Sequence, residues 1–496
     1  MSRTLSHLWQ RLQPWFVGSL GLAVVSGLGW RSPLLAAPLC AADLEPQINA
    51  ILQQQPAIRR AHWGIVVAPV AGGEPLYTRS AEQFFIPASN IKLLTTAAAL
   101  QHFGPAHRVR TTVYGHTEGG ETTVQIVGQG DPTLTAASLQ TLAQQVAQQL
   151  PRLGATAQID RLILDDTYFQ GDAINPNWEW EDLQAGYGAP VTSLILDGNA
   201  IHLRLTPQQI GQPLQVAFAS PLDAQDWALE NRSRTVAPTA PEEVQVVQDG
   251  QRQTLQVLGQ LRTGSAAEDV AIATPTPTLR FLRHFRAALI GAGLTVRRAE
   301  VAPQPSALPQ TLALQMSPPL AEWVAIANAE SENLYAETLL YLIGHDRAIA
   351  QTSTLAAGII GVEAILAELG VDPTGIDQAD GSGLSRKNLA TPTAFVQTLQ
   401  AMHRSPYGQV YRDSLAVAGV SGTLRNRFQG TPVVGRLQGK SGAISGIAAL
   451  SGYLTPPHHP PLAFSILVNH FDQPVRAIRP SIDDIVVLLA DLEACP

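Results

Sequence analysis

Cysteine is scarce in this chain, because its 496 residues include only Cys40 and Cys495. No CxxC pair and no cluster of cysteine with histidine occurs, so the sequence argues against a zinc site of the usual composition. The two histidines of PPHHPP near residue 458 stand among prolines, which is typical of a solvated loop. We therefore expect neither a metal nor another cofactor.

Charged residues are also few, at 15% of the chain against 45% hydrophobic residues. The net charge is −8 and no basic block occurs. Nucleic acid is therefore not an expected partner, because neutralising phosphates requires clustered Lys and Arg. This composition is that of a folded globular protein, and the length predicts two or three domains.

Only the N-terminus carries a long apolar run, PWFVGSLGLAVVSGLGW. Arg3 and Arg11 form a basic flank, and small residues follow in LLAAPLCAAD. This order predicts an export signal over residues 1–37 and an exported, periplasmic protein. A retained membrane anchor is the alternative. For the rest of the chain we expect at most peripheral membrane contact.

Hydrophobic periodicity predicts a discontinuous core. The segment HWGIVVAPVAGGEPLYTRS has the pattern of two strands joined at Gly72-Gly73, and a helix follows from Ser89 to Gly104. After the proline-rich stretch 301–310 come helices, two strands and a last helix. We predict an α/β, multidomain fold whose antiparallel sheet, flanked by helices, comes from residues 38–105 and 306–496. A strand-rich lobe over residues 106–305, forming one unit or two subdomains, would split it.

Ser89-x-x-Lys92 stands at the start of the predicted helix, with both side chains on one face. A serine hydroxyl is a weak nucleophile until a base takes its proton, and a lysine is that base only when it is neutral. Burial among apolar neighbours and a second nearby cation would both favour the neutral amine. A helix cap followed by a surface lysine is the structural alternative.

Two further polar motifs follow along the chain. Ser331-Glu332-Asn333 lies between apolar helical stretches and could present a hydroxyl and an amide to a cleft, or form a helix N-cap box. Lys440-Ser441-Gly442 lies on a strand before the last hairpin. Its glycine permits close approach of a substrate that adds as an extra strand. An edge strand protected by a lysine is the alternative.

The order of the three motifs resembles that of β-lactamases and penicillin-binding proteins. The segments FFIPASNIKLLTTAAAL, GQGDPTL, SENLYAETLL, DGSGLSRKNLATP, SGTLRNRF and GKSG resemble one family of these over nearly all of the mature chain. It is the D-alanyl-D-alanine carboxypeptidase/endopeptidase family, serine peptidase family S13. The chain departs from the usual motifs at Glu332, where Asp is common, and at Ser441, where the third motif usually has Thr.

The resemblance implies a penicillin-binding, β-lactamase-like transpeptidase core and a substrate ending in D-Ala-D-Ala. Ser89 would form the acyl-enzyme with Lys92 as base. Ser331 would relay a proton to the leaving D-alanine, and Asn333 would hold the substrate amide and Lys92. Backbone N–H groups of Ser89 and Ala443 would form the oxyanion hole.

The resemblance also assigns the binding of the substrate's ends. Lys440 and Ser441, beside Gly442, would hold the terminal carboxylate. Asp182 and Arg386 are candidates for the zwitterionic end of a diaminopimelate side chain, or they form a surface ion pair. The implied partners are peptidoglycan stem peptides, with β-lactams as inhibitors. A β-lactamase-like esterase and a non-catalytic wall-binding protein are the rival functions.

Cys40 and Cys495 flank the mature chain at its two ends. Export would place them where disulfides persist. The first and last helices are expected on the same core sheet, which would bring the two ends together and predicts a Cys40–Cys495 disulfide. Two unrelated cysteines, one of them removed with the signal, are the alternative.

Overall fold

The structure is a computed structural model that describes residues 39–54, 56–249, 252–302 and 308–495. The predicted export signal, residues 1–37, lies outside the described residues. Among the helices of the described part, none has the length and apolar character needed to cross a membrane.

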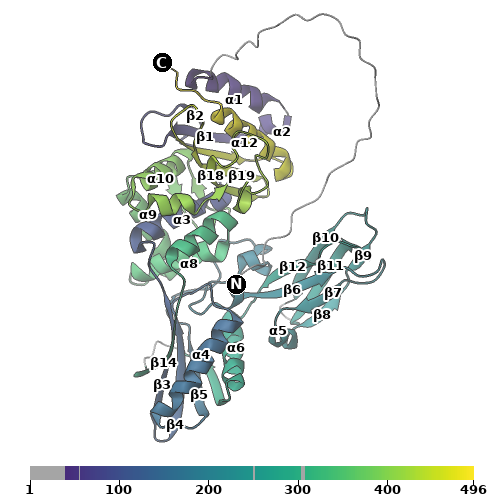
Figure 1. Ribbon diagram of the computed structural model, residues 1–496, viewed down its shortest axis with the longest axis vertical. Helices are drawn as coiled ribbons and strands as arrows, with labels where there is room; N and C mark the ends of the chain where they lie inside the picture. The colour runs from purple at the N-terminus through teal and green to yellow at the C-terminus, as the bar shows by residue number, and fades with distance from the viewer. Residues whose placement is uncertain (1–38, 55, 250–251, 303–307, 496) are drawn as a thin grey trace, which may run out of the picture.

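A six-stranded antiparallel sheet forms the centre of the core, with strand order β17-β18-β19-β20-β1-β2. Strands from the two ends of the chain therefore lie side by side (Figure 1). This confirms the expectation that the early hairpin and the late strands share one sheet. The strands are β1 (His62–Pro69), β2 (Tyr77–Arg79), β17 (Ala416–Val417), β18 (Leu437–Ile444), β19 (Ile447–Leu454) and β20 (Leu462–Asn469).

Helices cover both faces of this sheet, so its strands are apolar on both sides. Along β1, Ile65 and Val67 pack on one face while Val66 and Ala68 pack on the other. The first face is covered by α1 (Leu44–Gln53), α2 (Pro56–Arg60) and α12 (Val475–Ala490). The opposite face carries α3 (Ile91–Phe103), α7 (Leu320–Ala325), α8 (Asn333–Asp346), α9 (Thr354–Glu368), α10 (Pro392–Arg404) and α11 (Gly408–Asp413).

The inserted region begins with a five-stranded mixed sheet, ordered β13-β5-β4-β3-β14. Two helices, α4 (Ala136–Gln149) and α6 (Pro277–Gly291), pack on it and close a separate apolar cluster. In Figure 1 this unit lies at the end of the molecule away from the core. Its strands are β3 (Arg110–Glu118), β4 (Glu121–Gly128), β5 (Gln158–Asp165), β13 (Thr295–Val301) and β14 (Gln310–Met316).

A second unit of the inserted region consists of two small sheets that share one apolar cluster. Figure 1 shows it to the side of the first unit, with the short helix α5 (Pro221–Asp226). One sheet contains β6 (Ala200–Thr206), β7 (Gln215–Phe218) and β12 (Glu268–Ala273). The other contains β8 (Ala228–Asn231), β9 (Arg234–Val236), β10 (Glu243–Asp249) and β11 (Thr254–Arg262).

We propose the division into a core and an inserted region, with two changes to the expected limits. The strand β14 pairs with β3, so the inserted sheet ends at Met316 rather than at residue 305. The stretch after β5 also returns to the core, because Phe169, Val191 and Ile195 belong to the same apolar cluster as the core helices. The range 106–305 is therefore not wholly outside the core.

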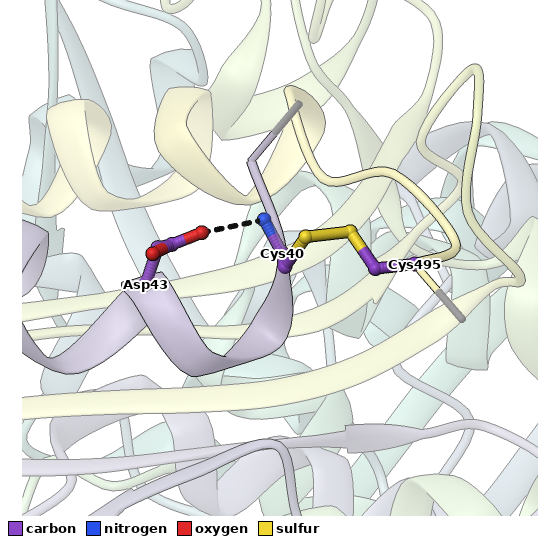
Figure 2. The surroundings of a disulfide bond; sticks show 3 residues. All are labelled: Cys40, Asp43 and Cys495. Carbon is purple, nitrogen blue, oxygen red and sulfur yellow. Dashed lines mark hydrogen bonds between the residues drawn. A yellow bond between two sulfur atoms is a disulfide. The ribbon is translucent and has the colours of Figure 1, made fainter. Parts of the chain in front are cut away.

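The two ends of the described chain meet beside α1 and α12. Cys40 and Cys495 form a disulfide with their Cα atoms 5.6 Å apart (Figure 2). The backbone N–H of Cys40 donates to Asp43 at 3.0 Å, and that of Glu493 donates to the carbonyl of Leu39 at 2.9 Å. The expected packing of the first and last helices on one face of the sheet therefore brings the cysteines together.

Replacing both cysteines by serine should lower the free energy of unfolding by at most about 4 to 5 kcal/mol, because the bond closes almost the whole chain into one loop. Denaturant unfolding of the oxidised parent and of the Cys40→Ser/Cys495→Ser variant measures the difference. Reduced parent protein is the control, and it should unfold at the midpoint of the variant. Equal midpoints for oxidised parent and variant would contradict the expectation.

Candidate active site

Ser89 lies in a short 3-10 turn, η2 (Ala88–Asn90), that leads directly into α3. The turn is tightly constrained, since Ala88 has φ +48° and a Cβ on Gly383 would lie 1.9 Å from the Ala88 carbonyl oxygen. Only glycine fits at position 383 without moving the turn. The Ser89 side chain is partly exposed and stands at the N-terminus of a 13-residue helix, where negative charge is stabilised.

Lys92 is the second residue of α3, one helical turn after Ser89, and it is completely buried. Its Nζ lies 3.1 Å from Ser89 Oγ, 2.7 Å from Asn333 Oδ1 and 2.6 Å from the carbonyl oxygen of Ser382. These acceptors come from three separate segments of the chain. The alternative of a helix cap followed by a surface lysine therefore does not describe this motif.

Burial lowers the pKa of Lys92 to about 8, because an uncharged amine loses less hydration free energy than an ammonium ion when it leaves water. We expected a second nearby cation to lower the pKa of Lys92 as well, but no cation is among the charges that shift it. The charges that act on Lys92 come from Asp380, Glu337 and Glu332, and all three raise its pKa. A substantial neutral fraction near physiological pH thus results from desolvation, partly offset by acidic neighbours.

The second motif lies where one helix ends and the next begins. Ser331 has φ +67° and joins the π-helical turn Ile326–Glu330 to α8. Its Oγ accepts a hydrogen bond of 2.8 Å from Lys440 Nζ. The N-cap position of α8 is Glu332, whose side chain makes no capping bond. The serine therefore faces the third motif rather than capping the helix.

Asn333 connects Lys92 to the inserted region. Its Oδ1 accepts from Lys92, and its Nδ2 donates to the carbonyl oxygen of Tyr187 at 2.9 Å. Both ends of the amide are thereby fixed, which orients the oxygen toward the lysine. The contact with Tyr187 was not expected from the sequence, because it uses a backbone carbonyl.

The third motif lies on β18, next to the Ser89 turn. A Cβ on Gly442 would lie 2.8 Å from the Pro87 carbonyl oxygen and 3.1 Å from the backbone nitrogen of Ser89, so the missing side chain permits close packing. Lys440 is completely buried, and its Nζ donates to Ser331 and to the Ser441 carbonyl oxygen at 2.9 Å. Burial lowers its pKa, and the charge of Lys92 lowers it further. A lysine that protects an exposed edge would instead lie in water.

The outer edge of β18 is open beside the motif. Its neighbour β17 pairs only with Gln438 and Gly439. From Lys440 to Ile444 the described residues provide no strand on that side. The exposed Ala443 lies on this stretch. An extended peptide could therefore pair with the edge while passing Ser89.

The loop that supplies the Ser382 carbonyl is held by two buried carboxylates. Glu337 accepts from the backbone N–H groups of Gly381 and Ser382 at 3.0 and 2.8 Å. Asp380 accepts from the N–H groups of Gly383 and Ser385 at 2.7 and 2.6 Å. Burial raises the pKa of Glu337, and the nearby Asp380 raises it further.

Sequence reasoning missed these two acids as parts of the site. Asp380 opens the segment DGSGLSRKN, so its position next to a Gly-Ser-Gly turn was the available signal. Glu337 lies four residues after Asn333, one helical turn further along α8. Both residues act on Lys92 through the position of a backbone carbonyl, a role that no spacing of side chains in the sequence reveals.

Asp182 and Arg386 lie near one another without forming the ion pair considered above. Asp182 accepts from the Tyr187 hydroxyl at 3.2 Å, and its pKa is raised by burial although the charge of Arg386 lowers it. Arg386 instead pairs with Glu179 at 3.1 Å and donates to the Ser445 carbonyl oxygen at 3.0 Å. Since Ser445 follows β18 and Tyr187 contacts Asn333, both candidates lie close to the three motifs.

The fold is that of the penicillin-binding and β-lactamase-like class of proteins. The chain belongs to the D-Ala-D-Ala carboxypeptidase 3 (S13) family, whose model matches residues 44–491. It is accordingly a serine-type carboxypeptidase, a hydrolase, and this confirms the resemblance seen in the sequence.

Similar proteins agree with this assignment. The chain is 35% identical to a D-alanyl-D-alanine carboxypeptidase of Actinomadura sp. (strain R39), over 90% of this chain and 85% of that protein. It is 26% identical to the penicillin-sensitive carboxypeptidase A of Dictyostelium discoideum, over 90% and 91% of the two chains. The crystal structure of penicillin binding protein 4 (dacB) from Haemophilus influenzae has the same fold, with a TM-score of 0.75 at 21% identity, covering 89% of this chain and 98% of that one.

Replacing Lys92 by arginine should slow acylation by 100-fold or more, because arginine keeps the charge but does not release its proton. The rate constant for covalent labelling by a β-lactam measures the effect. A variant that acylates within about tenfold of the parent would contradict the role of Lys92 as base.

The acylation rate of the parent should rise with pH, with a midpoint near 8. Lys92 is protonated and unable to accept a proton below its pKa of about 8, and it is neutral above that value. A pH series of pseudo-first-order labelling rates, with thermal unfolding followed in the same buffers as control, measures the midpoint. A rate that is flat between pH 6 and 9 would count against a lysine base.

Proposed function

We propose that the chain cleaves peptides ending in D-Ala-D-Ala through an acyl-enzyme on Ser89. The observation that carries this proposal is the position of Lys92 Nζ, 3.1 Å from Ser89 Oγ inside a completely buried environment. Ser89 Oγ attacks the penultimate D-alanyl carbonyl, and the C-terminal D-alanine leaves as a free amino acid. Water then hydrolyses the ester and regenerates the serine.

The neutral amine of Lys92 has two N–H groups and one lone pair. The two fixed acceptors, Asn333 Oδ1 and the Ser382 carbonyl, take the two N–H groups. The lone pair is left facing the Ser89 hydroxyl, which then donates its proton to Nζ as the oxygen attacks. Glu337 and Asp380 support this geometry by holding the loop that contains Ser382.

Ser331 is proposed to carry a proton to the departing amine. Its hydroxyl accepts from Lys440 Nζ, so the hydroxyl proton is free to point toward the leaving nitrogen. Asn333 is assigned mainly to the orientation of Lys92, because its Nδ2 is engaged by the Tyr187 carbonyl. A contact of Asn333 with the substrate amide would require the substrate to replace that carbonyl.

Backbone N–H groups of Ser89 and Ala443 are proposed to stabilise the oxyanion that develops on the attacked carbonyl. The tight approach of Gly442 to the Ser89 nitrogen supports this pairing of the two segments. Ser441 is proposed to bind the substrate's terminal carboxylate directly. Lys440 is proposed to position Ser331 and Ser441 rather than to bind the carboxylate, since its Nζ is buried and already donates to two oxygens.

The substrate class proposed is the stem peptide of peptidoglycan, with D-Ala-diaminopimelate cross-links as a second site of cleavage. The protein would then act outside the cytoplasm, as the predicted signal and the Cys40–Cys495 disulfide suggest. Asp182 and Arg386 would bind the ammonium and carboxylate of a diaminopimelate side chain, with Arg386 exchanging Glu179 for the ligand.

Penicillin should leave a penicilloyl adduct on Ser89, because the β-lactam carbonyl takes the place of the scissile peptide. The Dictyostelium relative is described as penicillin-sensitive, and a penicillin binding protein 4 from Haemophilus influenzae has been crystallised with a β-lactam. Intact-mass and peptide mass spectrometry locate the adduct, with Ser89→Ala as the matched control. An adduct on Ser331 would contradict the assignment.

The same experiment separates the rival functions. Rapid turnover of penicillin without accumulated adduct would favour a β-lactamase-like esterase. Binding of cell-wall fragments by Ser89→Ala, with no hydrolysis of D-Ala-D-Ala peptides by the parent, would favour a non-catalytic wall-binding protein. Release of free D-alanine by the parent and stable labelling at Ser89 would support the carboxypeptidase mechanism.

Asp182→Ala should weaken cleavage of diaminopimelate-containing peptides without slowing acylation by penicillin, which lacks that side chain. Because Asp182 also accepts from Tyr187, Tyr187→Phe serves as a control that removes the same hydrogen bond but keeps the carboxylate. The measurement is kcat/KM on matched peptides with diaminopimelate or alanine at the third position. An equal loss in the peptide and penicillin assays would show a general defect of folding and exclude a specificity role.

A further inference from the structure

Thr423 lies opposite Ser441 across the open edge of β18. The two hydroxyl oxygens are 2.9 Å apart and hydrogen-bonded. Thr423 is exposed and Ser441 is partly exposed, so both hydroxyls face the solvent-accessible side of the motif. The next residue, Leu424, is completely buried and anchors the turn from behind.

The backbone fixes where the Thr423 hydroxyl can lie. Thr423 is the middle residue of a 3-10 turn, η9 (Gly422–Leu424), and Gly422 has φ +56°. A Cβ on Gly422 would lie 2.3 Å from the carbonyl oxygen of Ala329, which belongs to the π-helical turn before Ser331. The turn η9 is thus wedged between the segment that carries Ser331 and the strand that carries Ser441.

The chemistry of Ser441 explains what a second hydroxyl adds. A threonine at this position would be held in few rotamers because it is β-branched, whereas serine is freer. In this chain the restraint comes from Thr423 instead. Each hydroxyl has one proton. Ser441 can donate to Thr423 while Thr423 donates to a carboxylate, or both hydroxyls can turn and donate side by side to it. Buried Lys440 holds the backbone at this point by donating to the Ser441 carbonyl oxygen at 2.9 Å.

We propose that Thr423 is a substrate-binding residue, and that its hydroxyl and that of Ser441 form one subsite for the C-terminal carboxylate of the substrate. This inference rests on the proposed function, in which Ser441 faces that carboxylate. It adds a residue outside the three motifs, and it assigns to the segment SGTLRNRF a role in selecting peptides with a free C-terminus. Arg425 of the same segment is engaged by Glu330 at 3.5 Å and is not needed for the subsite.

The test compares two peptides that differ only at the C-terminus, one ending in D-Ala-D-Ala and the other in D-Ala-D-alaninamide. The parent should prefer the free acid in kcat/KM. Thr423→Val, which keeps the shape and loses the hydroxyl, should reduce this preference about tenfold or more, since a hydrogen bond to a charged group is lost. Thr423→Ser should keep the preference within about threefold. Thr423→Val/Ser441→Ala should show little loss of preference beyond Ser441→Ala alone, because the two hydroxyls act as one unit.

Several results would overturn the subsite. The first three are an equal loss on both peptides in Thr423→Val, a Thr423→Ser variant as impaired as Thr423→Val, and a parent without preference for the free acid. A Thr423→Val variant that keeps the full preference would overturn it as well, while leaving the proposed function intact if D-alanine is still released. A parent that releases no D-amino acid product from either peptide would refute the proposed function and the subsite with it. Melting temperatures of the variants verify that each is folded.

Discussion

The burial of the Lys92 ammonium group is the constraint on which the rest of the site depends. A buried amine must find hydrogen-bond partners, because an unpaired charge or donor in the interior costs several kcal/mol. Its three acceptors come from η2, from the start of α8 and from the loop at Ser382. Since η2 lies more than 200 residues before the other two segments in the sequence, satisfying one nitrogen fixes the relative positions of distant parts of the core.

The acidic residues around Lys92 follow from the same constraint. Desolvation alone would lower the lysine's pKa further, and the charges of Asp380, Glu337 and Glu332 partly reverse that effect. With a pKa of about 8, Lys92 is neutral often enough to act as a base and still basic enough to accept the proton of Ser89. The carboxylates that moderate the pKa also bind the loop N–H groups, so one pair of side chains sets both the position and the basicity of the lysine.

Most of the core was predictable because its signals are local and periodic. The strand pair around Gly72-Gly73, the helix ending at Gly104 and the three motifs all have spacing that a sequence displays. Contacts through backbone atoms could not be predicted in this way, as with the carbonyls of Ser382 and Tyr187. The limit of the inserted region at residue 305 was misplaced, because β14 is recruited to the inserted sheet by pairing with β3.

The inserted region enters and leaves the core at one place, since β3 and β14 pair and the Ser317 N–H donates to the Val109 carbonyl at 2.9 Å. Such an insertion could be a passive attachment, but the contacts of its middle part argue otherwise. Trp178 Nε1 donates to buried Asp380 at 3.0 Å, and the Tyr187 carbonyl accepts from Asn333. Without the insertion, one of the carboxylates that hold the Ser382 loop and the amide that orients Lys92 would each lose a hydrogen bond. The inserted region is therefore a structural part of the active site, and its effect on Lys92 is exerted through the residues that position the lysine.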